Sequence, residues 1–458
     1  MRLNVADLKL NEEIPAVGLN RKRLQQVLAK VTRTQRSGSY RNELATLDNP
    51  EVIREYVKDV IEARGGEVAA RKRAEIIAHA FLELTKDQQH TFFELLKNEY
   101  GVDQLAVQTA IQNFDLTSDQ STTQLRTALE PIREQLFRRF VGVDDGLAFL
   151  VTLREDLLEH KDPQFSALDS ELKSLLNQCF DVGLLTLHQI TWDSPAALLE
   201  KLIEYEAVHA IQSWDDLRKR LGEDRRLYAF QHPALPNDLL IFVEVALIRG
   251  LAHSIDDLLD PATEVLDTKN SDTAIFYSIS NCQPGLSGVR LGDFLIKRVV
   301  SLLTSEIPSL KNFATLSPIP GFVKWLTSAI EHNDLPIFTR EQQLSLNSVQ
   351  AALQNPEWHQ SDELKQQLEP VLSQLCFYYL TSVKRGDRIS DPVANFHLSN
   401  GARIEQIQFL ANTRPDGLAQ SLGMMVNYRY VLDYIEENHD AYVHEGHVEI
   451  SKTLLELK

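Results

Sequence analysis

Residues 274–303 read AIFYSISNCQPGLSGVRLGDFLIKRVVSLL. Residues 274–280 are rich in apolar and β-branched side chains, which predicts a buried strand, and residues 294–303 have the apolar spacing of a helix. Gly285, Gly288 and Gly292 lie between them. In such an order, the loop N–H groups and the positive end of the helix dipole hold a phosphate without any net positive charge. A tight connection that binds nothing is the alternative interpretation.

The spacing of these glycines does not favour the two commonest nucleotide sites. It is neither G-x-G-x-x-G with an acidic residue some 20 positions later nor a Walker loop that ends in Gly-Lys-Ser/Thr. Dinucleotides and ATP are therefore poorer candidates. The pattern is closer to the coenzyme A loop of Gcn5-related N-acetyltransferases.

The rest of the chain divides into two parts. Up to about residue 180 the apolar residues repeat at helical spacing, and Thr85 and Gln88 form a capping box that predicts a helix start near residue 86. Further on, LLIFVEVAL at residues 239–247 predicts a second buried strand, and helical stretches interrupt the strands. We therefore predict an α + α/β fold, with an all-helical domain at residues 1–185 and a mixed α/β domain at residues 186–458.

Composition limits the classes of partner. The 458 residues carry a formal net charge of -18, which argues against a general nucleic-acid or anionic-membrane binder. No apolar stretch approaches the roughly 20 residues of a membrane-spanning helix, and the N-terminus lacks the features of a signal peptide. Cys179, Cys282 and Cys376 are far apart in the sequence, which suggests a reducing compartment and no structural zinc. We expect a cytoplasmic enzyme, with Cys282 as a small buried residue.

Ser317 lies in the stretch LSPIPGFVKW at residues 316–325. Two prolines and a glycine fix the backbone there, just after a short apolar run. The serine is ordinarily interpreted as a turn or helix-capping residue, because no G-x-S-x-G elbow surrounds it.

Two further polar stretches follow. His397 lies in DPVANFHLSNGA at residues 391–402, where a histidine can act as an acid or a base, although a structural histidine is the commoner case. Tyr430 ends GMMVNYRY at residues 423–430, whose aromatic side chains are core or reach a site, with core favoured. The histidines show no metal-ligand spacing such as H-E-x-x-H.

Taken together and in order, these stretches resemble the malonyl-CoA decarboxylase family. The resemblance covers most of the chain outside the first few tens of residues and the tail after about residue 435. The stretches that carry it are HPALP at 232–236, FYSIS at 276–280, FLIKRVV at 294–300, LSPIPGF at 316–322, DPVANFH at 391–397, NGA at 400–402 and NYRY at 427–430.

The resemblance implies a helical N-terminal domain used in oligomer contacts and an acetyltransferase-like C-terminal domain. It implies a homo-oligomer, a dimer or tetramer, that acts on malonyl-CoA without metal, biotin or pyridoxal phosphate. The catalytic serine and histidine fall on Ser317 and His397, and an active-site tyrosine falls on Tyr430. The coenzyme A loop falls on Ser287, Gly288, Val289, Arg290, Leu291, Gly292 and Asp293. Some family members carry a glutamate where this chain has Arg290, so a carboxylate at that position cannot orient His397 here.

The chemistry of decarboxylation suggests the roles of these residues. Loss of CO2 leaves the enolate of acetyl-CoA, so preorganised donors, for which backbone N–H groups are candidates, must stabilise charge on the thioester oxygen. Pro318, Ile319 and Phe322 can form an apolar wall around the departing carboxylate. As a hypothesis, Ser317 is the proton acceptor and His397 the proton donor. The alternatives are an acyltransferase that needs an amine acceptor, and a helical scaffold that senses malonyl-CoA without turning it over.

Overall fold

A computed structural model describes residues 50–457, except residues 237, 290, 333–334, 336–348 and 351–356. The chain forms two compact units. The first holds the described residues up to Leu185 together with residues 232–238 and 283–289. The second holds Thr186–Gln231, Leu239–Cys282 and the residues from 290 onward.

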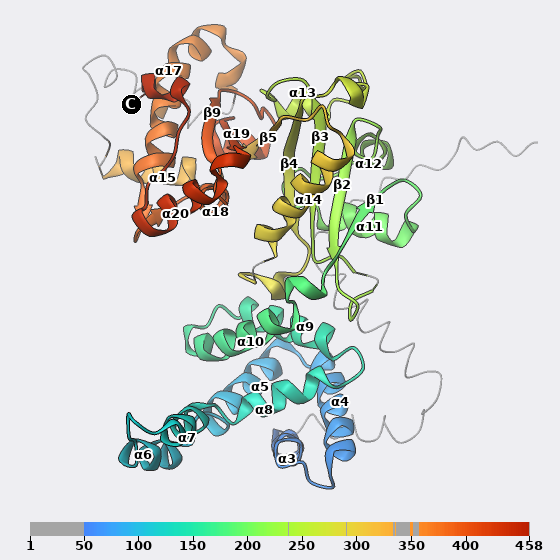
Figure 1. The fold of residues 1–458 in the computed structure, drawn as a ribbon, viewed down its shortest axis with the longest axis vertical. Coiled ribbons are helices and arrows are strands. Elements are labelled where there is room, and N and C mark those ends of the chain that lie inside the picture. The colour runs from blue at the N-terminus through green and yellow to red at the C-terminus, as the bar shows by residue number, and fades with distance from the viewer. Residues whose placement is uncertain are drawn as a thin grey trace, which may run out of the picture. The chain divides into compact units, whose positions relative to one another are not determined.

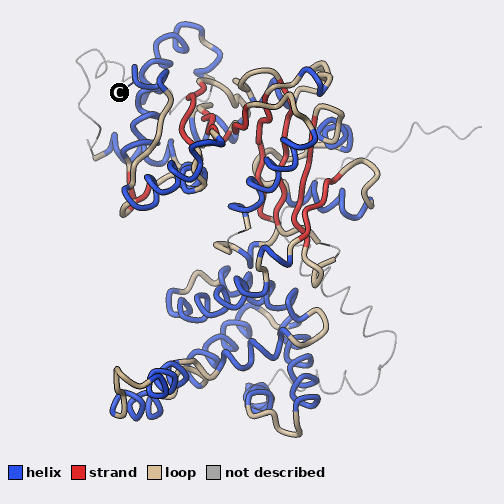
Figure 2. Tube along the Cα trace, in the orientation of Figure 1, coloured by secondary structure: helices blue, strands red, loops and turns tan. Residues whose placement is uncertain are grey.

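Helices make up the first unit (Figures 1 and 2). They are α3 (Pro50–Ile61), α4 (Glu67–Glu83), α5 (Lys86–Glu99), α6 (Gln104–Gln112), α7 (Asp119–Leu129), α8 (Arg133–Val141), α9 (Gly146–Glu159) and α10 (Ser166–Cys179). The predicted capping box is confirmed: Thr85 accepts from the N–H of Gln88, and the Gln88 side chain accepts from the N–H of Thr85 at 2.8 Å. Phe81, Phe93 and Phe149 form edge-to-face pairs in the core of this unit.

An eight-stranded sheet organises the second unit. Its order is β1-β2-β3-β4-β5-β10-β6, with β9 also paired to β10. The strands are β1 (Thr186–Ile190), β2 (Arg225–Gln231), β3 (Ile241–Ile248), β4 (Thr273–Asn281), β5 (Asn312–Thr315), β6 (Ser317–Pro318), β9 (Arg403–Gln408) and β10 (Met425–Tyr430). The predicted fold class, a helical part followed by a mixed α/β part, is confirmed.

The helices of this unit lie beside and beyond the sheet (Figure 1). They are α11 (Ala196–Tyr205), α12 (Trp214–Arg220), α13 (Ile255–Leu259), α14 (Gly292–Glu306), α15 (Phe322–Glu331), α17 (Asp362–Ser382), α18 (Pro392–Ser399), α19 (Pro415–Ser421) and α20 (Ile435–Glu445). A short hairpin, β7 (Lys384–Arg385) with β8 (Arg388–Ile389), precedes α18.

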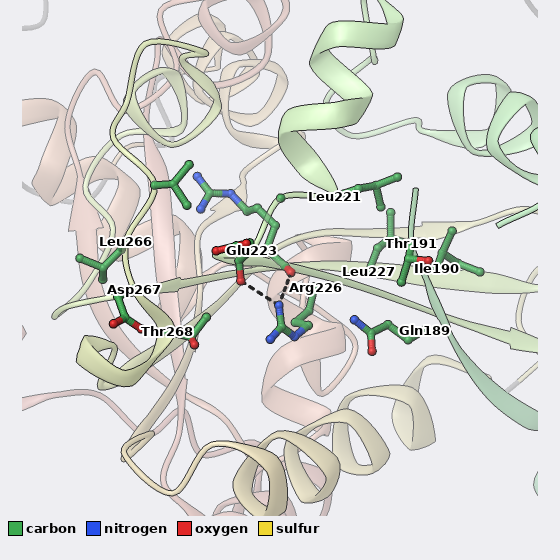
Figure 3. A pocket seen from close by; sticks show the side chains of 13 residues that line it. Gln189, Ile190, Thr191, Leu221, Glu223, Arg226, Leu227, Leu266, Asp267 and Thr268 are labelled. Atoms are coloured by element: carbon green, nitrogen blue, oxygen red, sulfur yellow. Dashed lines mark hydrogen bonds between the residues drawn. The ribbon is translucent and has the colours of Figure 1, made fainter. Parts of the chain in front are cut away.

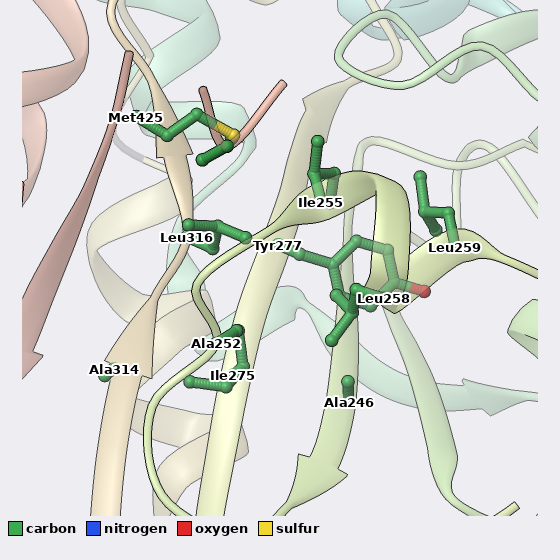
Figure 4. Close-up of a cluster of buried hydrophobic side chains, with 11 residues drawn as sticks. Ala246, Ala252, Ile255, Leu258, Leu259, Ile275, Tyr277, Ala314, Leu316 and Met425 are labelled. Atoms are coloured by element: carbon green, nitrogen blue, oxygen red, sulfur yellow. The ribbon is translucent and has the colours of Figure 1, made fainter. Parts of the chain in front are cut away.

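Side chains alternate between the two faces of the sheet, so each face has its own core. On one face, Leu227 and Ala229 of β2 pack with Leu217 of α12. On the other face, Tyr228 of β2 donates a hydrogen bond to Glu306 at the end of α14. A second apolar cluster lies where α13 meets β3, β4 and β5 (Figure 4), and it includes Ala246, Ile255, Leu258, Leu259, Ile275, Tyr277, Ala314, Leu316 and Met425.

The centre of the sheet opens between β4 and β5. These two strands pair in parallel from Thr273 with Asn312 to Phe276 with Thr315, and the N–H of Leu316 donates to the carbonyl of Phe276. Beyond that point the chain of β5 continues into β6, which pairs with β10, while β4 continues along β3. The β3–β4 register also shifts by one residue next to Tyr277, a β-bulge. The second half of β4 therefore has one strand partner in the described sheet.

Candidate active site

Ser317 is the first residue of β6. Its register is fixed by β10, because Ser317 lies opposite Val426 and, on the preceding strand, Phe313 lies opposite Tyr430. The Ser317 side chain is 5% exposed. The prolines that follow end the strand, as a proline cannot donate to a sheet ladder. The backbone of Ser317 is therefore fixed at the start of β6, by the pairing with β10 and by the prolines that follow.

His397 comes from a different element, the last turn of α18, and is also buried. Asp391 caps this helix and Pro392 follows the cap, so the local sequence explains where the helix begins. At its other end, Asn400 is the C-cap and Gly401 has a φ of 80°. The helix thus carries His397 into the interior of the α/β unit.

The three residues predicted as catalytic lie together. The Oγ atom of Ser317 is 3.2 Å from Nε2 of His397, and Nδ1 of His397 is 2.8 Å from the Oη atom of Tyr430. The ring of Tyr428 stacks on the imidazole, with centroids 4.7 Å apart. Tyr430, like Ser317 and His397, is almost fully buried. Both ring nitrogens of His397 are therefore engaged by hydroxyl groups.

The direction of these hydrogen bonds follows from a fourth residue, Thr315. The Ser317 hydroxyl donates to Oγ1 of Thr315 at 2.8 Å. Because a hydroxyl has one proton to give, the contact with His397 requires Nε2 to carry a hydrogen and to donate to Ser317. In the neutral imidazole Nδ1 is then the acceptor, and Tyr430 donates to it. The arrangement selects one tautomer of His397.

Burial decides the charge of this histidine. Removal from water lowers the pKa of His397 to about 3. Transfer of a cation from water to an apolar interior is costly, and neither of the two hydroxyl groups that contact the imidazole carries a compensating negative charge. His397 is therefore neutral across the physiological pH range.

Sequence reasoning missed Thr315 and Tyr428. Thr315 is fully buried, and its Oγ1 also accepts from the N–H of Tyr428 at 3.1 Å. The sequence does contain a pattern that points to Thr315: side chains two residues apart on a strand lie on the same face, and Thr315 precedes Ser317 by two residues. Tyr428 and Tyr430 stand in the same relation on β10, although the register of β10 against β9 shifts between Asn427 and Tyr428.

The predicted coenzyme A loop is divided between the two units. Ser287, Gly288 and Val289 belong to the helical unit, and Leu291 and Gly292 belong to the α/β unit. Arg290 and the side chain of Asp293 lie outside the described residues. In the α/β unit, Gly292 begins α14, and a Cβ there would lie 2.8 Å from the ring of Phe396, so the helix approaches the residue before His397 closely.

Within the helical unit, charged side chains of α9 and α10 surround the first part of that loop. Arg154 is buried and donates from one nitrogen, Nη1, to the carbonyls of Gly285 at 2.7 Å and Ser287 at 2.8 Å. Gly288 has a φ of 75°, and a Cβ built on it would lie 2.6 Å from the ammonium of Lys173. The ammonium is thus beside the loop backbone. Sequence reasoning named neither Arg154 nor Lys173.

Two cavities of the α/β unit differ in their relation to the predicted residues. One, of about 820 Å³, is bordered by the ends of β1 and β2 and by residues 265–268, and contains none of the predicted site residues (Figure 3). The other, of about 410 Å³, lies along α14 and is bordered by Tyr430. No group of three or more His, Cys, Asp or Glu side chains suited to a metal ion occurs among the residues that the structure describes.

Comparison with known proteins identifies the family. The sequence-family model of the malonyl-CoA decarboxylase C-terminal domain matches residues 183–457, and the family model of the malonyl-CoA decarboxylase N-terminal domain matches residues 100–180. Malonyl-CoA decarboxylase, mitochondrial, from Mus musculus is 37% identical over 421 residues, which cover 87% of this chain and 84% of the mouse protein. The corresponding protein of Anser anser anser is 39% identical over 359 residues, 73% of this chain and 71% of its own.

Solved structures agree with this result. The crystal structure of malonyl-CoA decarboxylase from Agrobacterium vitis matches with a TM-score of 0.83 and 37% identity, covering 88% of this chain and 99% of that one. The enzyme from Rhodopseudomonas palustris gives the same TM-score and identity over 89% of this chain and 99% of its own. The family resemblance seen in the sequence is confirmed. This chain belongs to the malonyl-CoA decarboxylase family.

Proposed function

We propose that this protein converts malonyl-CoA to acetyl-CoA and CO2 at the site formed by Ser317, His397 and Tyr430. The observation that carries the assignment is the buried 3.2 Å contact between Ser317 Oγ and His397 Nε2, which joins residues 80 positions apart. It lies in a chain of the malonyl-CoA decarboxylase family. The contact provides a hydroxyl and a neutral imidazole at one point, shielded from water.

The steps follow from the hydrogen-bond order. Ser317 turns its hydroxyl proton from Thr315 to the malonyl carboxylate, and Ile319 and Phe322, both fully buried, lie in the segment that follows it. The bond between the carboxyl carbon and C2 breaks, CO2 leaves, and the electron pair passes into the thioester as an enolate. His397 then gives its Nε2 proton to C2 while Nδ1 takes the proton of the Tyr430 hydroxyl, so the imidazole stays neutral and water reprotonates the tyrosine oxygen. One proton is taken up from water in each turnover.

The substrate itself supplies the electron sink, so the reaction needs no cofactor. The thioester carbonyl accepts the electron pair that CO2 leaves behind, provided that donors stabilise its oxygen. We assign this role to backbone N–H groups of β4 beyond Phe276, where the strand has left its pairing with β5. Such donors are fixed before the reaction, which is why they are worth a few kcal/mol in the transition state.

For coenzyme A, the proposed contacts are the loop Ser287–Asp293 and Lys173. Arg154 holds the carbonyls of Gly285 and Ser287, so the peptide that joins Ser287 to Gly288 turns its N–H away from that arginine. The Lys173 ammonium lies beside Gly288, 2.6 Å from the position that a Cβ on this residue would take. An ammonium and an N–H together suit a phosphate group, even in a protein of net negative charge.

The helical unit offers a surface for self-association. Helices α6 and α7 pack on each other, and apolar side chains of α6 and of the loop that joins the two helices are unusually exposed: Leu105 is 73%, Ile111 59% and Leu116 88% exposed. We assign this hairpin to contacts between copies of the chain in a dimer or tetramer, because apolar patches of this kind mark association surfaces. Sedimentation of the wild type beside a Leu105→Glu, Leu116→Glu variant tests it, and an unchanged oligomeric state would contradict it.

Localisation in the cytoplasm is also part of the proposal, together with a role in supplying acetyl-CoA and in fatty acid metabolism. No helix in the described part of the chain is long and apolar enough to cross a membrane. The vertebrate relatives carry the word mitochondrial in their names. Fractionation of the source cells decides between the compartments.

The deciding experiment uses malonyl-CoA alone, without metal or acceptor, and measures acetyl-CoA and CO2 with the wild type, Ser317→Ala and His397→Ala. Equimolar products from the wild type and a large loss in both variants would support the proposal. Binding without turnover would favour the malonyl-CoA sensor, and turnover that depends on an added amine would favour the acyltransferase. Lys173→Met is expected to raise KM for malonyl-CoA about tenfold at unchanged kcat, the cost of one charged contact.

A further inference from the structure

A buried carboxylate begins the helix that carries His397. Asp391 has no exposed surface and is the N-cap of α18. Its Oδ1 accepts from the N–H groups of Val393 at 3.0 Å and Ala394 at 2.9 Å. Because these donors belong to the first turn, this oxygen fixes the start of the helix whose last turn holds the histidine.

The second oxygen of Asp391 reaches the segment that carries Ser317. Oδ2 accepts from the N–H of Gly321 and from the Oη atom of Tyr379, each at 3.4 Å. Gly321 follows Ser317 by four residues, and two of the three residues between them are prolines, whose φ angles are fixed. A restraint on Gly321 is therefore passed to Ser317 through a stiff backbone.

We propose that Asp391 is a positioning residue, which holds Ser317 Oγ and His397 Nε2 at contact distance by binding both of their backbone segments. The inference rests on the proposed decarboxylation and extends it to a residue that touches neither substrate nor imidazole. A shift of about 1 Å between reacting groups costs roughly 100-fold in rate, so a restraint of this kind has a measurable effect.

The contact between Gly321 and Asp391 requires a glycine at position 321. A Cβ on Gly321 would lie 2.2 Å from the Oη atom of Tyr379, so a residue with a side chain does not fit unless the tyrosine moves. The tyrosine is itself fixed, because its ring stacks on Trp325 with centroids 5.1 Å apart. The close approach of Gly321, Tyr379 and Asp391 is thus built into the fold.

The charge of Asp391 is also unusual. In the part of the chain described, no lysine, arginine or histidine forms an ion pair with it, and burial raises its pKa. It is held by four donors, namely three backbone N–H groups and one tyrosine hydroxyl. An asparagine has one acceptor oxygen, so it can satisfy the helix or Gly321, but not both.

This difference provides the test. Asparagine and serine are good N-cap residues, so Asp391→Asn and Asp391→Ser keep the helix cap and remove the contact with Gly321. Each variant is measured for kcat and KM with malonyl-CoA, alone and combined with His397→Ala. We expect kcat to fall about 100-fold in the His397 enzyme with KM changed less than about twofold. In the His397→Ala background the same change should have almost no further effect, since there is no imidazole to position.

Asp162→Asn is the matched control. Asp162 is also an N-cap aspartate with both oxygens occupied, by the backbone N–H and the side chain of Gln164, and it lies in the helical unit. Its substitution should leave kcat unchanged. Equal losses from Asp391→Asn with and without His397, or a loss confined to KM, would overturn the positioning role.

Tyr379→Phe keeps the inference testable if the Asp391 variants fold poorly. It removes one donor to Oδ2 and leaves the N–H of Gly321 in place, so we expect an intact thermal transition and a kcat loss smaller than that of Asp391→Asn. An unchanged kcat would count against the proposal. A wild type without decarboxylase activity would instead refute the proposed function, so the two failures are distinct.

Discussion

Two buried histidines of the α/β unit, His397 and His209, have the same burial and opposite surroundings. Each is 2% exposed, and burial lowers the pKa of each to about 3. Hydroxyl groups engage both ring nitrogens of His397. No side chain hydrogen-bonds a ring nitrogen of His209 in the described structure, and only the backbone of Tyr277 acts on its pKa as a hydrogen-bond partner.

The neighbours of His209 are charged rather than neutral. Arg220 and Arg414 lower its pKa further, and Asp256 opposes them. Arg220 forms an ion pair with the fully buried Glu244 at 3.1 Å. Burial, and to a smaller extent the negative charge of Glu206, raise the pKa of Glu244 to about 8. This region is a network of ionisable side chains around a ring that no hydroxyl group orients.

The comparison shows that burial and a low pKa do not by themselves identify a catalytic histidine. Ion-pair networks shift pKa values for structural reasons as readily as active sites do. What distinguishes His397 is a set of neutral partners that orient the ring and leave one proton on Nε2. Variants of His397 and of its partners, compared with control variants elsewhere in the chain, test whether these neutral partners mark the catalytic histidine.

The largest expected difference is between His397→Ala and His209→Ala. Removal of a general acid typically costs 10²- to 10⁴-fold, so we expect kcat to fall by about 10³ for His397→Ala. His209→Ala should leave kcat within about twofold, although the cavity it creates lowers stability. Steady-state assays with malonyl-CoA, together with thermal unfolding, measure both. Comparable kcat losses in the two variants would mean that burial alone had identified the site.

Tyr430→Phe should have the next largest effect. It removes the donor to Nδ1 of His397 and with it the preference for the Nε2–H tautomer, so we expect kcat to fall roughly 10- to 100-fold at unchanged KM. Tyr228→Phe is the control, because Tyr228 also donates from the interior of the sheet, to Glu306, without contacting His397. If the two variants have equal kcat values, Tyr430 does not orient the histidine.

Thr315→Val tests the direction of the Ser317 proton. The change keeps the shape of the side chain but removes the acceptor for Ser317 and for the N–H of Tyr428. We expect a loss of about tenfold in kcat, and about 1–3 kcal/mol in the free energy of unfolding, the cost of an unsatisfied buried N–H. Thr315→Ser, which keeps the hydroxyl, should restore most of the activity, and failure to do so would argue for a packing role.

The smallest expected effects on activity concern pH, because burial keeps both histidines neutral, whereas stability does depend on pH. An unfolded histidine titrates near pH 6.5, whereas folded His209 and His397 stay neutral to about pH 3. The unfolded state therefore binds more protons between these values, so this contribution to stability is complete above pH 6.5 and is lost as the pH falls toward 3. Each histidine contributes up to about 1.4 kcal/mol per pH unit.

Replacement of His209 by Phe should make the stability of the protein less dependent on pH between 6.5 and 4, measured by urea unfolding against the wild type at each pH. The activity profile gives a second measurement. Because His397 is already neutral, kcat/KM should show no titration near pH 6.5. A titration there that disappears in His397→Ala would show that the imidazole is charged in the working enzyme.

Local structure followed from sequence more readily than the site did. The Thr85 capping box, the strands at β3 and β4, and the helix α14 each have a local physical signature, and the structure contains all of them. Cys282 is buried as expected, and no disulfide joins Cys179, Cys282 and Cys376 to one another.

The site depended on long-range pairing that no local pattern records. The sequence favoured a turn or helix-capping role for Ser317, which lies in a strand of only two residues, and it assigned no element to the polar stretch of His397, which lies in a helix. Ser317 and Tyr430 are placed by the register in which β10 pairs with β5 and β6, and His397 reaches them from α18; the local sequence specifies neither arrangement. The family resemblance identified Ser317, His397 and Tyr430 from the sequence, whereas Thr315, Asp391 and Lys173 were identified only in the three-dimensional structure.

The hydrogen bonds from Arg154 to the carbonyls of Gly285 and Ser287 bear on whether the two halves of the sequence can fold separately. Segments 232–238 and 283–289 are encoded within the α/β half but pack with the helices. A fragment that starts at Thr186 would leave both segments without their supports, including the loop proposed to hold coenzyme A. The α/β half is therefore not expected to fold completely without the helical half. A chimera of two relatives must take these two segments and the helices from the same parent.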